Sequence, residues 1–372
     1  MSIENIKSPH DIPQKATVTI QPVGSTIIAT DRFGHRIFND DQFARLWANV
    51  IASIPAPSRS HPERILTKGF IRHNGKCMVP NFLTVEIDGR HYLSNGVNDN
   101  MFELDSNEPL GITFEGGGIL DGNLANQTAQ PCNGIYGEQT VATPQTPVCR
   151  IRHLQIVKTF DNPVRIINTS AYSTYWLLHD LLLLTDYRCG LWMEGMTDIN
   201  LDLVQAGGYI ADFRFGNDAT HACANIMANN IYGVGGGMRL YGNNFQMNNV
   251  FLDSGDDRVI CRLEGCYRSN FTNINIRKVD NANSNKNPAI KLSVNAATDC
   301  TQNTFSSINI YSKVAAVFKW GIEETDANQD NNVYGVVNAP AISATNAVRM
   351  LGANSKPTLG NEHLINGAVV RV

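Results

Sequence analysis

The triplets Phe213-Arg214-Phe215, Met238-Arg239-Leu240 and Cys261-Arg262-Leu263 each place a cation between two apolar residues. Five more triplets follow the pattern, one of them with Trp at its centre: Val164-Arg165-Ile166, Leu191-Trp192-Met193, Ile290-Lys291-Leu292, Phe318-Lys319-Trp320 and Val348-Arg349-Met350. Neighbouring centres are separated by 22 residues at the least (192 to 214) and 30 at the most (319 to 349). Such alternation is typical of a strand that buries two side chains and exposes the middle one. A strand repeated at this period predicts a solenoid.

A second strand recurs in the same repeats, which predicts coils of a parallel β-helix. It is expected at Leu181–Leu184, Asn225–Met227, Val250–Leu252, Ile274–Ile276, Ile308–Ile310 and Val333–Val336. Asparagines precede several of these strands: Asn244, Asn270, Asn303, Asn332 and Asn361. We expect their side chains to hydrogen-bond from coil to coil.

The ends of the chain differ from the repeats. Residues 1–62 are expected to hold an extended lead-in and a helix from Asn39 to Ile54, capped by Asn39 with Gln42 completing a capping box. Its apolar stripe predicts a lid over the open end of a β-helix spanning residues 63–372. The last residues, Ala368–Val372, read as a strand without a cap, which favours a homo-oligomer.

Composition narrows the possible partners. The net charge of −4 and the scarcity of charged residues (17%) argue against a general affinity for nucleic acid. No stretch is long and apolar enough to predict a membrane span, and Met1–Asn5 does not open like a secretory signal; the compartment stays undetermined. The eight cysteines lack metal-ligand spacing, although Cys132 and Cys149 flank one loop and would be able to pair outside a reducing cytosol.

Beyond the repeats, several segments resemble the pectin-lyase-like superfamily over roughly residues 30–340. These are Asp31–Gly34, the capping helix, the strand Pro80–Ile87 and Gly117–Gly122. The resemblance implies an all-β, right-handed, single-stranded parallel β-helix with an N-terminal capping α-helix. It also implies that the strand with the triplets lines a glycan-binding groove.

Within that superfamily, two stretches look closest to the polygalacturonase family. Gly255-Asp256-Asp257, followed by Val259–Leu263, is similar to the Gly-Asp-Asp motif and strand of that family. One coil earlier, Gly236–Leu240 stands in place of its Asn-Thr-Asp segment, so a Gly replaces the first catalytic Asp. The family's Gly-His-Gly segment would fall near Asn287–Ala289, where no His occurs. Only Asp256 and Asp257 carry over.

Stacked coils turn the triplet centres into a column of cations about 4.8 Å apart, which repel by about 1 kcal/mol per pair even in water. One interpretation is local pairing with acids expected on the same outer face, namely Asp212, Glu194 and Glu264. The other is recognition of an acidic polysaccharide, because three acids do not balance seven cations. Arg214, Lys291 and Lys319 would then bind substrate, with Trp192 and Tyr241 as sugar-stacking faces.

Two mechanisms are open for such a site. As a hydrolase, the chain would use Asp212 with Asp256 and Asp257, whose mutual repulsion raises one pKa as a general acid requires. In the alternative interpretation, Asp256 and Asp257 have a structural role and belong to a turn that caps the next strand.

As a lyase, Arg239 and Arg262 would serve as base and neutraliser, and Asp253, Asp256 and Asp257 offer oxygen ligands for Ca²⁺. No cofactor is otherwise expected. We therefore expect an enzyme that cleaves an anionic glycan, hydrolase or lyase, resembling tailspike depolymerases and forming a trimer. The alternative is a non-catalytic glycan-binding or structural β-helix.

Overall fold

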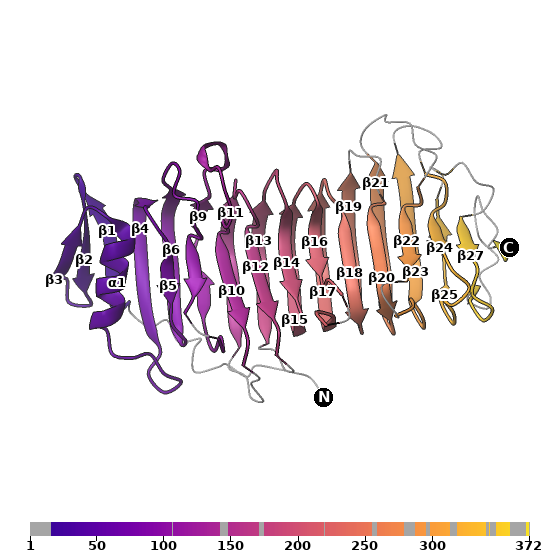
Figure 1. The fold of residues 1–372 in the computed structure, drawn as a ribbon, viewed down its shortest axis with the longest axis horizontal. Coiled ribbons are helices and arrows are strands. Elements are labelled where there is room, and N and C mark those ends of the chain that lie inside the picture. The colour runs from indigo at the N-terminus through magenta and orange to yellow at the C-terminus, as the bar shows by residue number, and fades with distance from the viewer. Residues whose placement is uncertain are drawn as a thin grey trace.

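The structure, a computed structural model, describes residues 16–105, 107–141, 148–170, 175–218, 220–254, 259–278, 287–294, 298–312, 318–339, 342, 347–357 and 370–371. These residues form an elongated right-handed parallel β-helix, with one α-helix at its N-terminal end (Figure 1). The fold expected from the repeated triplets is confirmed. No helix within the described ranges has the length and apolar character to cross a membrane.

One series of strands carries the triplets, and we call it the short-strand face. Each of its strands pairs in parallel with the corresponding strand one coil away. The series comprises β5 (Cys77–Val79), β7 (Phe102–Leu104), β10 (Ile135–Gln139), β12 (Val164–Asn168), β14 (Cys189–Glu194), β16 (Ala211–Phe215), β18 (Met238–Asn243), β20 (Cys261–Tyr267), β22 (Ile290–Ser293), β24 (Ile322–Glu324), β27 (Val348–Met350) and β29 (Val370–Arg371).

The other series consists of longer strands that turn a corner, so that each has a first and a second segment on different faces. They are β4 (Glu63–His73), β6 (Leu83–Leu93), β8 (Thr113–Glu115), β9 (Ile119–Asp121), β11 (Cys149–Val157), β13 (Trp176–Leu184), β15 (Thr197–Gly207), β17 (Cys223–Val234), β19 (Gln246–Ser254), β21 (Asn270–Lys278), β23 (Thr304–Ser312), β25 (Val333–Tyr334), β26 (Val337–Asn338) and β28 (Lys356–Pro357). Within the described residues, the long strand of two coils is divided into two short strands, β8 with β9 and β25 with β26. A short 3-10 helix, Leu124–Asn126, follows β9.

The corner in each long strand is one residue with left-handed backbone geometry. In seven successive coils this residue is in register with its neighbours and has a φ between 50° and 56°: His153, Asp180, Leu203, Asn230, Asn249, Asn273 and Ser307. Asn and Asp tolerate this conformation better than other residues with a side chain. Leu203 does not, and its side chain is half exposed at 51%.

Apolar residues at alternate positions fill the interior of the coils. In β16, β18 and β20 the outer members of each triplet are buried and the central Arg is half-buried, as the alternation predicted. Aromatic rings stack from coil to coil inside this core: Phe271 on Phe305 at 5.0 Å and Phe305 on Tyr334 at 5.3 Å between centroids. All eight cysteines are buried and free, so the predicted pairing of Cys132 with Cys149 does not form.

The N-terminal helix, α1 (Phe43–Ser53), is shorter than the predicted Asn39–Ile54 and lacks the capping box. The side chain of Asp40 accepts the backbone N–H of Gln42 at 2.8 Å, and Asn74 from a neighbouring coil accepts that of Ala44 at 3.0 Å. The first turn is thus capped by one local side chain, Asp40, and by one tertiary contact, Asn74, which the local sequence cannot specify. The predicted apolar stripe is buried, as a lid requires: Phe43, Leu46, Trp47 and Val50.

Ahead of α1, the lead-in folds into an antiparallel meander of β1 (Val18–Val23), β2 (Thr26–Asp31) and β3 (Arg36–Asp40). Strand β1 also pairs in parallel with β4, so the meander continues the solenoid instead of preceding it as a loose segment. Together with α1 it covers the first coil (Figure 1).

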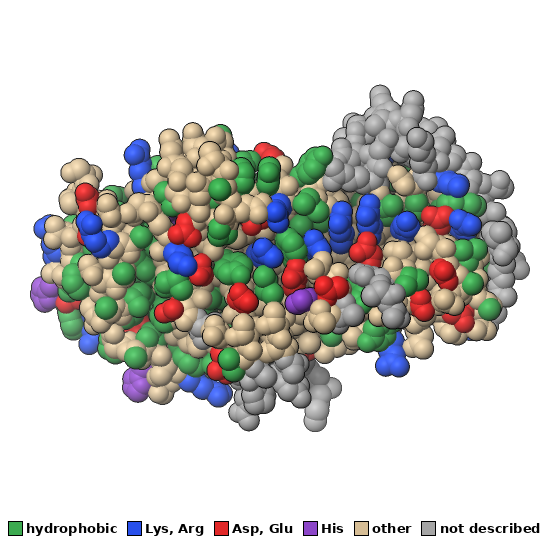
Figure 2. All heavy atoms as spheres, viewed as in Figure 1, with side chains coloured by type: hydrophobic (Ala, Val, Ile, Leu, Met, Phe, Trp, Pro, Cys, Tyr) green, Lys and Arg blue, Asp and Glu red, His purple; other side chains and the backbone are tan. Residues whose placement is uncertain are grey.

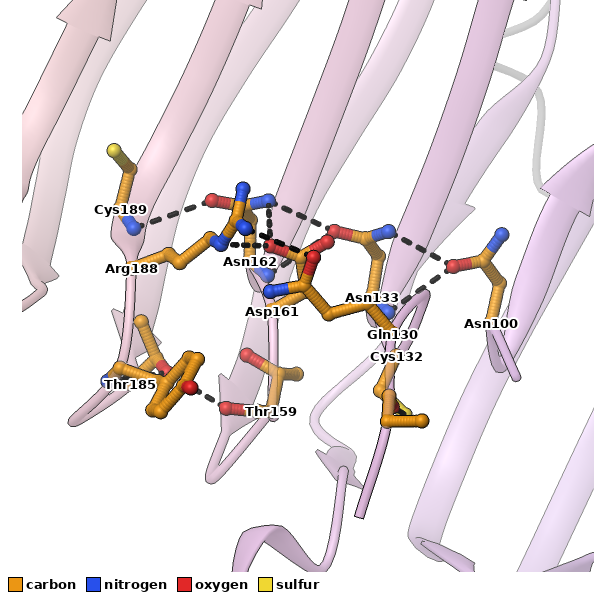
Figure 3. A network of polar contacts seen from close by, with 12 residues as sticks. Asn100, Gln130, Cys132, Asn133, Thr159, Asp161, Asn162, Thr185, Arg188 and Cys189 are labelled. Carbon is orange, nitrogen blue, oxygen red and sulfur yellow. Dashed lines mark hydrogen bonds and ion pairs between the residues drawn. The ribbon is translucent and has the colours of Figure 1, made fainter. Parts of the chain in front are cut away.

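Asparagine ladders hold the turns of successive coils together, as the recurrent Asn residues predicted. Figure 3 shows one of them: the side-chain oxygen of Asn100 accepts Nδ2 of Asn133 at 2.8 Å, and that of Asn133 accepts Nδ2 of Asn162 at 3.0 Å. A second buried ladder joins Asn303 to Asn332 at 3.1 Å. The predicted Asn361 lies outside the described residues.

Beneath α1 the core contains a chain of buried polar side chains. The imidazoles of His73 and His91 are 2.8 Å apart, and His91 contacts the hydroxyl of Thr67 at 2.9 Å. Phe43 packs edge-on against both imidazole rings. Burial lowers the pKa of His91 to about 3, and burial together with the neighbouring His91 lowers that of His73 well below its usual range.

Leu203→Asn should raise the free energy of unfolding by about 1 kcal/mol, because Asn relieves the left-handed strain while little buried apolar area is lost. Urea denaturation measures the change. Leu203→Ala serves as the control, since it removes the exposed side chain but keeps a Cβ in the left-handed region and should gain little. Equal stabilities for all three proteins would show that Leu203 is not strained.

Acidification should weaken the fold through the buried histidines. In the unfolded chain they bind protons near pH 6.5, whereas folded His91 binds one only near pH 3, so stability is lost as the pH falls from about 6.5 toward 3. Each histidine contributes at most about 1.4 kcal/mol per pH unit. The double variant His73→Gln/His91→Gln should flatten this part of the pH profile relative to the unaltered protein, and the exposed His35→Gln should leave it unchanged. A profile that the double variant does not alter would contradict the assignment.

Candidate functional site

All the expected triplet centres except Lys319 lie in one column along the outside of the short-strand face. Strand pairing sets this order of neighbours: Tyr136, Arg165, Trp192, Arg214, Arg239, Arg262, Lys291, Glu323 and Arg349. We call the run Arg214, Arg239, Arg262 and Lys291 the cation column. Figure 2 shows Lys and Arg side chains in a row across β16 to β22, with acidic side chains beside the row.

The centre of the cation column has few partners. Within the part of the chain that the structure describes, Arg239, Arg262 and Lys291 make no ion pair or side-chain hydrogen bond. Burial lowers the pKa of Arg239, as do the nearby charges of Arg262 and Arg214, while Glu264 acts in the opposite direction. Among the described acids, Glu264 therefore offsets only part of the repulsion between like charges on adjacent coils.

At the N-terminal side of the column, two guanidinium groups enclose an indole ring. The Cζ atoms of Arg165 and Arg214 lie 4.4 and 4.2 Å from the ring centroid of Trp192. Cation–π contacts of this kind contribute about 0.5–2 kcal/mol each. Only 7% of Trp192 is exposed, so the prediction of a sugar-stacking face is wrong for this residue. Instead, Trp192 fixes the orientation of two cations.

A second row lies two residues beyond the column and contains two of the three predicted acids, Glu194 and Glu264. Glu264 on β20 is half-buried and close enough to Arg239 to raise its pKa. Glu194 on β14 is 6% exposed. Tyr241 in the same row is only 3% exposed, and its hydroxyl lies 3.2 Å from that of Thr298. Its predicted role as a stacking face for sugars is therefore also wrong.

Lys319 does not belong to the column. In the pairing register the neighbour of Lys291 is Glu323, and Phe318 makes only an isolated bridge with Ile342. Glu323 binds Arg349 at 2.7 Å, so the column of like charges ends with an ion pair. Two successive stretches, Phe318–Trp320 and Ile322–Glu324, have the alternating pattern of a strand. The second one pairs with β22.

Asp212 is buried and does not face outward beside the cations, which corrects the predicted placement. Its carboxylate accepts three backbone N–H groups, from Gly208 at 3.0 Å, Gly236 at 2.9 Å and Gly237 at 2.7 Å. Burial raises the pKa of Asp212 to about 7 despite these donors, which favour the ionised form. Asp212 thus ties the turns of two coils together, and a substrate on the outer surface does not reach it.

The predicted pair Asp256 and Asp257 lies outside the described residues. Asp253, on the preceding strand, accepts Arg277 Nε at 2.8 Å and the hydroxyl of Tyr232 at 2.7 Å. With both oxygens bound, Asp253 does not fit the predicted role of a Ca²⁺ ligand. Across the described ranges no three His, Cys, Asp or Glu side chains come together as a metal site.

Gly236 stands where the polygalacturonase resemblance would put a catalytic Asp. A Cβ on Gly236 would lie 2.2 Å from the carbonyl oxygen of Gly208 and 2.7 Å from Cα of Ala211. Backbone atoms this close exclude any side chain. The packing of the turn therefore closes this position to a carboxylate.

Sequence reasoning missed a buried ion pair in the turns before the column. Asp161 is 2% exposed and binds Nε of Arg188 at 3.2 Å, and Arg188 also donates to Gln130 at 2.8 Å (Figure 3). Burial raises the pKa of Asp161, and the charges of Arg188 and Arg165 lower it. Asp161 lies four residues before Arg165, and Arg188 lies four residues before Trp192. This shared offset from the column is the sequence signal that could have revealed the ion pair.

The fold and the column together define a right-handed parallel β-helix with a cationic outer row. No protein-family profile and no curated protein matches the sequence. Among solved structures, the chain is similar to the A-modules of two mannuronan C-5 epimerases of Azotobacter vinelandii. For AlgE4 the identity is 12%, covering 84% of this chain and 95% of the module, with a TM-score of 0.59. For AlgE6 the identity is 13%, covering 84% of this chain and 93% of the module, with a TM-score of 0.52.

A variant tailspike protein of the E. coli bacteriophage HK620 is also similar, at 14% identity over 88% of this chain and 68% of that one, with a TM-score of 0.49. At these identities, the two epimerase modules support the fold and say nothing of the reaction.

Asp212→Asn should lower the free energy of unfolding by about 2–3 kcal/mol, because an amide NH₂ would face backbone N–H donors that lose their charged acceptor. Urea denaturation at pH 8, where the carboxylate is ionised, measures the loss. Asp198→Asn, at an exposed position near the start of β15, is the control and should change little. A stable Asp212→Asn protein would contradict the structural role.

Proposed function

We propose that this protein binds an anionic polysaccharide along the cation column and cleaves it. The observation that carries the proposal is the run Arg239, Arg262 and Lys291, three cations on adjacent coils that form no ion pair within the described residues. Neighbouring strands lie about 4.8 Å apart, so each pair repels by about 1 kcal/mol in water and more where the side chains are half-buried.

A polymer with repeated acidic groups would relieve this repulsion at several coils at once. Each carboxylate or sulfate would receive charge-assisted hydrogen bonds, which contribute about 1.5–3 kcal/mol. The stack of Arg165, Trp192 and Arg214 supports the same interpretation, because it holds two further guanidinium groups in fixed positions before any ligand arrives.

For the reaction we propose elimination, with Arg239 as the base and Arg262 as the cation that neutralises the uronate carboxylate. Arg239, in its neutral form, takes the proton on the carbon beside the carboxylate. That electron pair forms a carbon–carbon double bond as the glycosidic C–O bond breaks, and the departing oxygen takes a proton from water. The lowered pKa of Arg239 supports this role, because a base must first lose its own proton.

Hydrolysis has less support. The predicted partner Asp212 is buried beneath a turn, and Gly236 leaves no room for the carboxylate of the polygalacturonase arrangement. The same two facts favour the second candidate function, a non-catalytic glycan-binding β-helix, in which the cations bind the polymer without reacting. We also propose that the protein forms a homotrimer.

Arg239→Ala and Arg262→Ala should each weaken binding of polygalacturonate about 10- to 100-fold, the equivalent of one charge-assisted hydrogen bond. Calorimetry in 50 and 300 mM salt measures this, and affinity should fall at the higher salt. The control is Arg268→Ala, an exposed cation on a different turn, which should leave binding unchanged.

Incubating the protein with a panel of acidic polysaccharides separates the two candidate functions. Elimination produces unsaturated ends that absorb near 235 nm, and Arg239→Ala should abolish their formation. Salt-sensitive binding without this absorbance or new reducing ends would establish the non-catalytic function. Binding insensitive to both salt and the two Arg substitutions would refute the site.

A further inference from the structure

A second candidate site lies on the first segments of β17, β19 and β21, away from the short-strand face that carries the cations. It is a hollow of about 280 Å³. Its lining is made of Met227, Asn229, Gln246, Met247, Asn248, Asn270 and Thr272. None of these residues carries a charge, in contrast to the cation column one face away.

The amides of the hollow are held in place by one another. Asn248 donates its Nδ2 to Oδ1 of Asn229 at 3.4 Å, and Asn270 donates its Nδ2 to Oε1 of Gln246 at 3.0 Å. Gln246 in turn donates to Asn244 at 3.1 Å. The bonds from Asn248 to Asn229 and from Asn270 to Gln246 join neighbouring coils. A ligand would therefore meet side chains that are already ordered.

Three polar groups of the hollow remain available. Within the described residues, Nδ2 of Asn229 donates to no acceptor, and Oδ1 of Asn248 and Oδ1 of Asn270 accept from no donor. Met227 adds an apolar surface, since 44% of it is exposed. The hollow therefore offers a ligand one amide NH₂ group as donor, two amide oxygens as acceptors and an apolar surface.

This combination matches a neutral sugar ring. A hydroxyl group both donates and accepts, so it satisfies the amide N–H and the two amide oxygens, whereas a carboxylate only accepts and leaves the oxygens unmet. The C–H face of a pyranose would lie against Met227. We propose that the hollow is a binding site for one uncharged sugar residue, separate from the cation column. The proposal does not depend on the proposed cleavage activity.

The experiment uses the whole protein labelled with ¹³C at the Met methyl groups, with the signal of Met227 assigned from Met227→Leu. Maltohexaose, cellohexaose and mannohexaose are titrated in turn. At least one should shift the Met227 signal to saturation. Asn248→Asp should weaken that binding at least tenfold, because a carboxylate removes the donor to Asn229 and adds charge. Asn275→Asp, on the second segment of β21, is the matched control and should bind as the unaltered protein does.

Binding of polygalacturonate by Asn248→Asp, measured by calorimetry, should remain unchanged, which keeps this site distinct from the cation column. Absence of a saturable Met227 shift with all three neutral probes would overturn the proposal. So would equal shifts with polygalacturonate, since an acidic polymer should not prefer this hollow. These results in the unaltered protein decide the question even if Asn248→Asp folds poorly.

Discussion

Parallel hydrogen bonding between successive coils is the constraint on which the rest of this structure depends. It sets residues about twenty or more positions apart in sequence about 4.8 Å apart in space, in a fixed register. Any residue type that recurs at one position of the repeat becomes a column. Where the recurring type is Arg or Lys, the fold itself creates a line of like charges that a less regular domain would avoid.

Turns and corners make this regularity possible, and they draw on polar residues to do so. A left-handed residue bends each long strand, and Asn ladders join neighbouring turns. Asp212 anchors two Gly-rich turns by accepting three backbone N–H groups. In such a protein an Asp or Asn at a repeated position is first a structural element, and only exposure toward a ligand gives it a chemical role.

The faces of the solenoid consequently differ in chemistry. The short-strand face carries cations with few acidic neighbours among the described residues, which suits an acidic polymer. The first segments of β17 to β21 carry amides and Met side chains, which suit an uncharged sugar. A repeat of this kind supplies each face with its own set of side chains, and so one chain can present two surfaces of unlike charge.

Much of the architecture was predictable from the sequence, because alternation, repeat length and Asn-rich turns are local patterns that strand pairing preserves. The triplets alone identify Arg214, Arg239, Arg262 and Lys291 as neighbours. Side-chain environment was less predictable. The sequence pattern predicts that Trp192 and Tyr241 face outward and are exposed. In the structure, two guanidinium groups cover Trp192, and Tyr241 contacts Thr298.

The sequence by itself determined the β-helix and the existence of a cationic column, since both follow from the period of the repeat. Only the tertiary structure decided which residues complete the column and which acids face it. Phe318-Lys319-Trp320 and the stretch Ile322–Glu324 both alternate, and hydrogen bonding to β22 places Glu323 beside Lys291. Asp212 lies two residues before Arg214 on the same strand, so alternation predicts that it faces outward. Its carboxylate instead lies inward, where it accepts backbone N–H groups of the turns, because buried donors require an acceptor.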